Sequence, residues 1–181
     1  SKEKLKLYNK SFTKKIPKKK ILISCVANAV PRKNILFLIE LFKELNARKP
    51  NKYHLYIAGG FGPDTNKIKH LINYYRLKKN ISYKQNLLNS EISTLLRLSK
   101  FFCLFSKELN REFEGLGIVF LEAMFTKNII LSSKHGGIQN IIKNKKNGYL
   151  FNIKRTDVKA KIIKKIEFIS KNKKERKTII G

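Results

Sequence analysis

The sequence predicts an α/β protein in which a doubly wound parallel sheet carries helices on both faces. Two observations lead to this fold class. The first is a set of short, β-branched apolar runs with the length and composition of strands buried on both faces. The second is that helical stretches separate these runs, and such alternation indicates βαβ units. The clearest strand runs are 21–27, 53–58, 101–105 and 129–133, and weaker ones are 81–84 and 149–151.

Amphipathic periodicity defines the expected helices. After the first strand, apolar residues such as Ile35, Leu38 and Phe42 recur at three- and four-residue spacing and share one helical face. Asp64 follows a Gly-Pro pair and is expected to cap one helix, and Ser90 is expected to cap the next. The expected helices cover 33–48, 65–77, 89–99, 117–126, 137–143 and 156–171.

Composition divides the chain into three parts. Residues 1–20 are polar and lysine-rich and are expected to form a linker or an incoming tail. Residues 21–171 hold every expected strand and helix, and the length of 181 residues suits one domain with a sizeable core. Residues 172–181 begin another charged helix and then stop, which predicts a truncated C-terminal segment.

The chain is strongly basic, with 41 Lys and Arg against 12 Asp and Glu and a formal charge of +29. Such a surface favours polyanions. Lys, Asn and Ile are enriched together along the whole chain, which is also the pattern that A/T-rich codons produce. The functional alternative is attraction to an anionic membrane surface, at about 1 kcal/mol per basic residue near the lipid. Recognition of nucleic acid is not expected, because no motif for it accompanies the charge.

Cysteine and histidine usage argues against a metal site. Cys25 and Cys103 each fall inside an expected buried strand, which predicts reduced core residues and a cytoplasmic protein. The sequence has no C-x-x-C or H-E-x-x-H motif, and its histidines are scattered. It also has no apolar run of about 18 residues, so we expect a soluble or peripheral protein and no membrane span.

Residues 114–124 form a glycine-bracketed turn that runs into an apolar helix. Glycines let the backbone approach a ligand closely, and the first N–H groups of a helix form an anion site. Glu122 has apolar neighbours one turn away on both sides, which favours a sheltered carboxylate that needs a hydrogen-bonding partner. A phosphate at the turn and a sugar diol at Glu122 would meet both demands. Two simpler interpretations stay open, namely that Glu114 complements the helix dipole and that Glu122 is a surface residue.

Five short motifs occur in an order and spacing typical of one enzyme family. They are VPRKN at 30–34, IAGGFGPD at 57–64, EGLGIVFLE at 114–122, GGI at 136–138 and NGYL at 147–150. Together they resemble the C-terminal half of retaining GT-B glycosyltransferases, the group called glycosyl transferases group 1. The resemblance covers about residues 21–170. The GGI motif is equally compatible with a simple turn before a helix.

This resemblance implies a Rossmann-like domain that is one half of a GT-B fold and binds a nucleotide-sugar. The expected reaction moves a sugar from a UDP- or GDP-linked donor to a glycan or lipid-linked acceptor, with retention and without a metal or other cofactor. The acceptor would be held by a missing N-terminal domain, from which residues 1–20 would lead. The isolated fragment would then bind nucleotide without turnover.

The resemblance also implies roles for individual residues. Glu114 would be the catalytic residue beside the donor sugar, Glu122 would hold the ribose hydroxyls, and Lys33 would neutralise the diphosphate. A fixed cation and a helix N-terminus are suited to the charge that develops on a leaving diphosphate. The remaining donor contacts would come from the backbone of Gly115, Leu116, Gly117 and Ile118 at the phosphate and sugar, and of Asn86 and Leu87 at the base.

The first turn departs from the family pattern. The family usually has Gly-Arg-Leu there, whereas this chain has Ala-Asn-Ala at 27–29. Asn28 therefore replaces an arginine that shares the diphosphate, and we expect Arg32 to compensate for the lost charge. The departure keeps two alternatives open. One is a catalytically impaired GT-B paralogue or scaffold, and the other is a basic nucleic-acid-binding α/β module.

Overall fold

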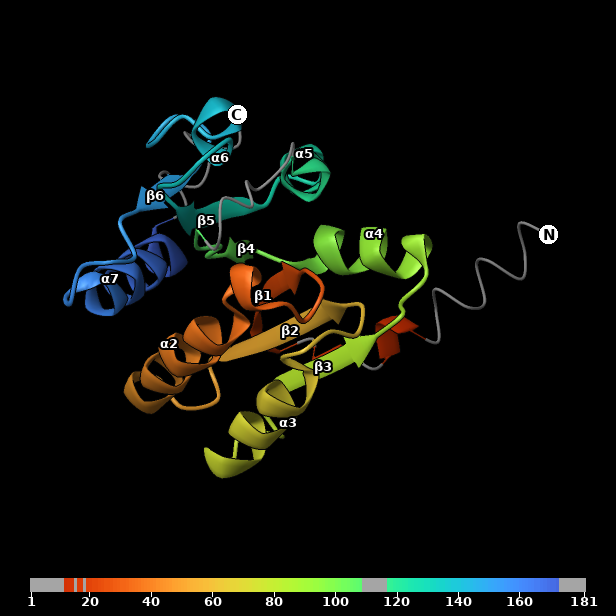
Figure 1. Cartoon of the computed structure of the whole chain (residues 1–181). Coiled ribbons are helices and arrows are strands. Elements are labelled where there is room, and N and C mark those ends of the chain that lie inside the picture. The colour runs from red at the N-terminus through yellow and green to blue at the C-terminus, as the bar shows by residue number, and fades with distance from the viewer. Residues whose placement is uncertain (1–11, 15, 18, 109–116, 173–181) are drawn as a thin grey trace.

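The computed structural model describes residues 12–14, 16–17, 19–108 and 117–172. In this part of the chain, six strands form one sheet in the order β3-β2-β1-β4-β5-β6 (Figure 1). Every neighbouring pair of strands is parallel. The strands are β1 (Ile21–Val26), β2 (Tyr53–Gly59), β3 (Ile81–Gln85), β4 (Phe101–Leu104), β5 (Ile129–Ser133) and β6 (Tyr149–Phe151).

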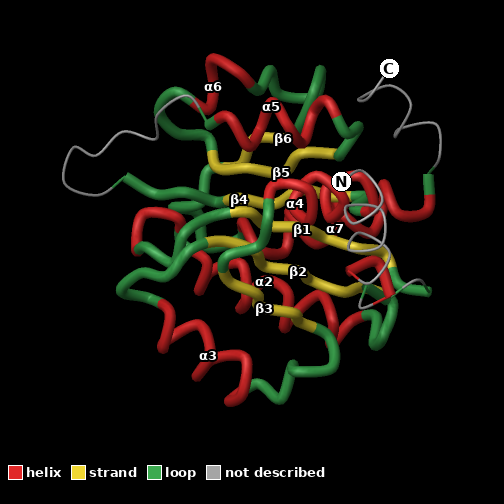
Figure 2. Tube along the Cα trace, turned by 90° about the vertical axis from the view of Figure 1, so that its right-hand side faces the viewer, coloured by secondary structure: helices red, strands yellow, loops and turns green. Residues whose placement is uncertain are grey.

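Helices cover both faces of this sheet. In Figure 1, α2, α3 and α7 lie on one side, and α4 and α5 lie on the other. Figure 2 shows the strands stacked from β6 at the top to β3 at the bottom. The helices are α2 (Ile35–Arg48), α3 (Thr65–Tyr74), α4 (Asn89–Leu98), α5 (Ile118–Phe125), α6 (Ile138–Ile141) and α7 (Val158–Lys171), and a short 3-10 turn, η1, covers Pro31–Lys33.

The strand order reverses beside β1, and this reversal positions the site. The chain runs outward from β1 through β2 to β3, then returns through α4 to β4 on the other side of β1. Because crossovers between parallel strands are right-handed, the crossover helices α2 and α3 lie on one face and α4 and α5 lie on the other. The turns after β1 and β4 therefore diverge and leave a crevice at the carboxyl end of the sheet. The predicted doubly wound fold is confirmed.

The sheet is buried on both faces. On the α2 side, Ile23 and Cys25 join the main core. On the other side, a second cluster includes Phe12, Tyr56 and Leu95, with the Phe12 and Tyr56 rings packed edge to face. Part of the segment expected to be a linker or tail thus packs on the domain.

Both cysteines are buried and free, as expected of reduced core residues. Burial raises the pKa of the Cys25 thiol to about 12, with a smaller opposing effect of Lys33. Burial also raises the pKa of Cys103 well above its usual value. Neither thiol therefore ionises near neutral pH, and neither is a nucleophile.

The helix caps differ from expectation. Ser90 is not a cap, because α4 begins at Asn89 and the Glu91 carboxylate accepts the Leu88 N–H at 2.9 Å. Asp64 does precede α3, but its side chain makes no capping hydrogen bond. It faces Lys67 instead, at 3.5 Å between carboxylate and ammonium.

Candidate nucleotide-binding groove

The turns that follow β1 and β2 are tied together at the carboxyl end of the sheet. The Ala27 N–H donates to the Ala58 carbonyl at 2.8 Å, and the Ala29 N–H donates to the Gly60 carbonyl at 3.2 Å. A Cβ atom on Gly59 would lie 1.8 Å from the Ala27 carbonyl oxygen. Only glycine permits this approach, so the glycines of the IAGGFGPD motif fix the position of the β1–α2 turn.

A third turn joins them. The Asn86 N–H after β3 donates to the Gly59 carbonyl at 3.1 Å. At the tip of the first turn, Asn28 accepts the Gly60 N–H through Oδ1 at 2.8 Å. The three turns enclose a cavity of about 500 Å³, which is lined by Val26, Ala27, Asn28, Arg32, Lys33, Gly59, Gly60, Asn86, Leu87 and Ile92.

Five residues predicted from the sequence to bind a donor therefore meet in one cavity. They come from two turns that are more than fifty residues apart in the chain, and they are Asn28, Arg32, Lys33, Asn86 and Leu87. The two cations give this end of the site a positive potential, and the amide of Asn28 adds a neutral donor group.

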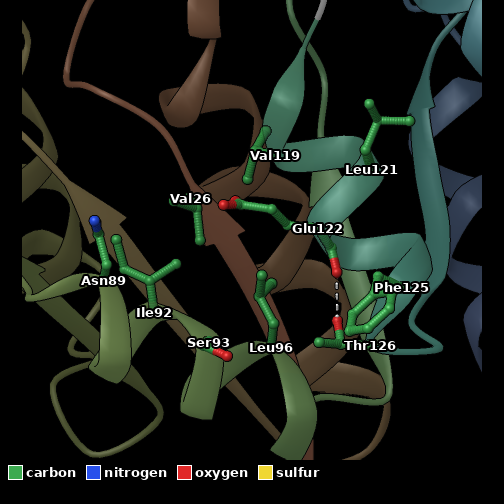
Figure 3. A pocket seen from close by; sticks show the side chains of 10 residues that line it. All are labelled: Val26, Asn89, Ile92, Ser93, Leu96, Val119, Leu121, Glu122, Phe125 and Thr126. Atoms are coloured by element: carbon green, nitrogen blue, oxygen red, sulfur yellow. Dashed lines mark hydrogen bonds between the residues drawn. The ribbon is translucent and has the colours of Figure 1, made fainter.

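A second cavity, of about 510 Å³, lies between α4 and α5. Figure 3 shows the Glu122 carboxylate reaching from α5 toward Val26, opposite Asn89 and Ile92 of α4. The wall around it is mostly apolar. The lining residues are Val26, Asn89, Ile92, Ser93, Leu96, Val119, Leu121, Glu122, Phe125 and Thr126.

Glu122 is solvent-exposed, which corrects the expectation of a sheltered position. The reason is that α5 buries only Phe120 and Ala123, so apolar neighbours such as Phe125 remain open to solvent and cannot shield the carboxylate. Within the described residues, the Glu122 carboxylate has no hydrogen bond or ion pair. The carboxylate is therefore a hydrogen-bond acceptor on the wall of a cavity, with no partner in the part of the chain that the structure describes.

The two cavities are adjacent, because Val26 and Ile92 line both. We call their union the switch-point groove, since it follows the carboxyl end of β1 where the strand order reverses. One end holds Arg32 and Lys33, and the other end holds Glu122. A ligand that carries negative charge at one end and hydroxyl donors at the other would match both ends.

A buried amide holds the two helical walls of the groove together. Asn128 follows α5, and its Nδ2 donates to the carbonyls of Leu96 and Ser99, at 2.9 and 2.6 Å, at the end of α4. Its Oδ1 accepts the Thr126 hydroxyl at 3.0 Å, and that hydroxyl also approaches the Glu122 carbonyl at 2.8 Å (Figure 3). The separation of α4 and α5 is therefore set by hydrogen bonds as well as by packing.

The other predicted site residues lie elsewhere or are not described. Gly117 precedes α5 and Ile118 is its first residue, one turn before Glu122, but neither is among the described residues that line the groove. Glu114, Gly115 and Leu116 lie outside the described residues.

Sequence analysis missed the contribution of α4. Asn89 and Ser93 are polar residues four positions apart, and Ile92 and Leu96 lie beside them. A polar pair with helical spacing beside an apolar pair is a signal that could have suggested a ligand-facing side. Which side faces the groove depends on how α4 packs after its crossover, and the sequence does not specify that.

Two further properties follow from the described residues. No group of three or more His, Cys, Asp and Glu side chains among them is placed to hold a metal ion. None of the helices in the described ranges combines the length and apolarity needed to cross a membrane.

The sequence matches the family described as glycosyl transferases group 1 over residues 9–180. The chain belongs to this family. The match covers nearly the whole chain and includes the groove with its three turns. No curated protein matches the chain.

Solved structures of glycosyltransferases share the fold. The C-terminal domain of the glycosyl transferase group 1 protein LpcC from Francisella tularensis is 25% identical, with a TM-score of 0.75 over 93% of this chain and 84% of that domain. TarM of S. aureus, in a complex with UDP, is 26% identical with a TM-score of 0.69 over 90% of this chain. HepE of Anabaena, in a complex with UDP-glucose, is 15% identical with a TM-score of 0.75 over 99% of this chain, and shows the fold alone.

The chain spans only part of the longer neighbours, namely 32% of the TarM chain and 46% of the HepE chain. It corresponds to one half of a GT-B glycosyltransferase. The LpcC structure is itself a C-terminal domain.

Proposed function

We propose that this chain is the donor-binding domain of a retaining GT-B glycosyltransferase. It binds a UDP- or GDP-linked sugar in the switch-point groove, and the enzyme transfers that sugar to a glycan or lipid-linked acceptor. The proposal includes a cytoplasmic location and attraction of the basic surface to an anionic membrane. In this proposal the acceptor is held by a second domain outside the chain, so the chain alone binds nucleotide without turnover.

The observation that carries the proposal is that the groove has two cations at one end and a carboxylate at the other. Arg32 and Lys33 line one cavity and are suited to a diphosphate, and we assign the base to Asn86 and Leu87 of the same cavity. The Glu122 carboxylate has no hydrogen-bond partner among the described residues, and it can accept from the paired hydroxyls of a ribose. A nucleoside diphosphate contains all three groups, and its ribose joins the base to the diphosphate.

The same arrangement suits the chemistry of transfer. Cleavage of the bond between sugar and phosphate leaves extra negative charge on the diphosphate, and fixed cations stabilise that charge. Positive character grows on the anomeric carbon, which a carboxylate beside the sugar stabilises. We assign that second role to Glu114. The reaction so described requires no metal ion.

Nucleotide binding by the chain itself tests the central claim. We expect UDP or GDP to raise the melting temperature of the wild-type chain. Glu122→Ala removes the ribose acceptor and is expected to abolish the shift, because an exposed carboxylate contributes little to stability but a charged hydrogen bond contributes about 1.5–3 kcal/mol to binding. Glu167→Ala on α7, on the other face of the sheet, is the matched control and should leave the shift unchanged. Equal shifts in both variants would contradict the assignment of the groove.

A catalytically impaired paralogue is the second candidate, and Asn28 is the observation that favours it. Its side chain brings no charge to the diphosphate end, where the family usually has arginine. Both candidates bind nucleotide in the groove, so binding cannot separate them. Transfer from radiolabelled UDP- and GDP-sugars by the protein with its acceptor domain does separate them. Labelled product supports the enzyme, its anomeric configuration tests retention, and transfer in the presence of EDTA tests independence of metal.

A further inference from the structure

A second concave site lies at the carboxyl ends of β4, β5 and β6, beside the switch-point groove but outside it. Its cavity has a volume of about 660 Å³. The two sites are neighbours in the sequence at one point: Lys33 lines the groove, and the next residue, Asn34, lines this cavity. The residues that line it are Asn34, Lys107, Glu108, Lys134, His135, Gly136, Asn152, Ile153 and Lys154.

Lysines from three different turns converge on this cavity. The backbone N–H group of each lysine donates a hydrogen bond, and these bonds fix the positions of the three Cα atoms. Lys107 donates to the Arg32 carbonyl at 2.8 Å, Lys134 to the Phe151 carbonyl at 2.7 Å, and Lys154 to the Asn152 side-chain oxygen at 3.1 Å. None of the three ammonium groups forms an ion pair within the described residues. The convergence is therefore a product of the fold and not only of the high lysine content.

The imidazole of His135 and the carboxylate of Glu108 limit which kinds of ligand this cavity can bind. The Nε2 atom of His135 is shielded from water and has no hydrogen-bond partner in the described part of the chain, which is costly unless a ligand supplies one. Glu108 adds one carboxylate to the lining, so the site is not built for anionic groups alone. A carboxylate there can accept hydrogen bonds from hydroxyl groups.

We propose that this cavity binds a phosphomonoester of a polyol or sugar. A phosphomonoester carries a charge of about −1.5 to −2 and three strong acceptor oxygens, which matches three lysines better than a carboxylate does. The adjacent hydroxyls of the ligand lie at Glu108. This site is distinct from the nucleotide groove, and its existence does not depend on the proposed function. The same chemistry is found in soluble phosphorylated saccharides and in lipid headgroups.

Titration of the whole chain with glycerol 3-phosphate in the presence of saturating UDP tests the site. Two-dimensional ¹⁵N NMR should show shifts at the amides of Asn34, Lys107, Lys134 and His135. The triple variant Lys107→Ala/Lys134→Ala/Lys154→Ala is expected to bind at least about tenfold more weakly, since each charge-assisted contact contributes more than 1 kcal/mol. It should keep its thermal response to UDP, whereas Glu122→Ala should lose that response and keep phosphate binding.

The control removes the same charge elsewhere. Lys69, Lys78 and Lys79 are exposed residues in and after α3, and their triple alanine variant should bind glycerol 3-phosphate within about twofold of wild type if the effect is local. Equal losses in the two triple variants, or full binding in the first, would overturn the site. In addition, Glu108→Ala should reduce the preference for glycerol 3-phosphate over orthophosphate, and an unchanged preference would overturn the hydroxyl contact.

Vesicles distinguish the two sources of the ligand. Phosphatidic acid presents a phosphomonoester, whereas phosphatidylserine at matched surface charge does not. One outcome is that binding to phosphatidic acid vesicles is stronger than to phosphatidylserine vesicles in the wild type and the control variant, and not in the first triple variant. That result assigns the site to a lipid headgroup. Equal binding to both vesicles, together with specific binding of glycerol 3-phosphate, assigns it to a soluble phosphorylated saccharide. Both results support the site.

Discussion

At the scale of single residues, Asn28 determines what the first turn offers to a ligand. The Gly60 N–H needs an acceptor and takes the Asn28 Oδ1 at 2.8 Å. Because an N–H group needs an oxygen as its acceptor, this contact fixes which of the two terminal amide atoms of Asn28 is the oxygen. The Nδ2 group is then free to donate into the cavity that Asn28 lines with Arg32 and Lys33. The residue thus joins two turns and leaves a neutral donor at the proposed diphosphate position.

Asn28→Asp separates these two roles. The carboxylate still accepts the Gly60 N–H, so we expect the melting temperature without ligand to change by no more than about 2 °C. The donor is replaced by a negatively charged oxygen facing the diphosphate, and we expect the Kd for UDP to rise at least about tenfold. Isothermal titration calorimetry measures the second effect. An affinity equal to wild type would exclude Asn28 from the phosphate contact.

At the scale of elements, the groove depends on the spacing of α4 and α5. Asn128 is buried and connects the end of α5 to the carbonyls of Leu96 and Ser99 at the end of α4. At the opposite end of α4, the first turn is fixed by the hydrogen bond of Glu91 to the Leu88 N–H. The α4 wall is thus held at both ends, although its middle turns provide the lining.

Asn128→Ala leaves two buried carbonyls with fewer partners and is expected to lower the free energy of unfolding by about 2–3 kcal/mol. We also expect weaker UDP binding at a temperature where the variant is folded, because α5 carries Glu122 and loses its tie to α4. Urea denaturation and calorimetry measure the two effects. Thr94→Ala on α4 removes only a local hydroxyl bond to the Ser90 carbonyl and is the control for general loosening of that helix. Unchanged affinity in Asn128→Ala would show that packing alone sets the groove.

Local periodicity predicted which elements form, but it predicted the ends of only some of them. The strand at 129–133 has the expected bounds, with Asn128 before it and Lys134 after it. The helix expected at 65–77 ends at Tyr74, since Arg76 adopts a left-handed conformation with φ of 55°. Arginine gives no sequence signal for such a turn, unlike Asn34, whose φ of 53° precedes α2.

The candidate site was predictable where it depends on turns and less so where it depends on helix packing. Asn28, Lys33 and Asn86 lie in the segments that follow strands β1 and β3, and the carboxyl ends of parallel strands share one edge, so topology brings them together. The side of α4 that carries Asn89 and Ser93 is selected by long-range packing across the crossover.

At the scale of the whole molecule, the charge is spread over the surface. Some cations are engaged in ion pairs, such as Lys159 with Glu40 and Glu44 on neighbouring helices. Other lysines lie on helices, as on α3 and α7, and in the turns after β4, β5 and β6. Twelve acidic residues cannot neutralise 41 basic ones, so the molecule as a whole is attracted to any anionic surface.

This distribution predicts how the chain binds a membrane. Binding to phosphatidylserine vesicles should be strong at low salt and should fall steeply as the salt concentration approaches about 0.5 M, where the Debye length is below about 5 Å. Because the charge is spread over helices and turns, the alanine variant at Lys69, Lys78 and Lys79 and the one at Lys107, Lys134 and Lys154 should weaken binding by similar factors. Co-sedimentation across a salt series measures both effects. If one triple variant abolished phosphatidylserine binding and the other left it intact, attraction would come from a defined patch and the dispersed-charge account would be wrong.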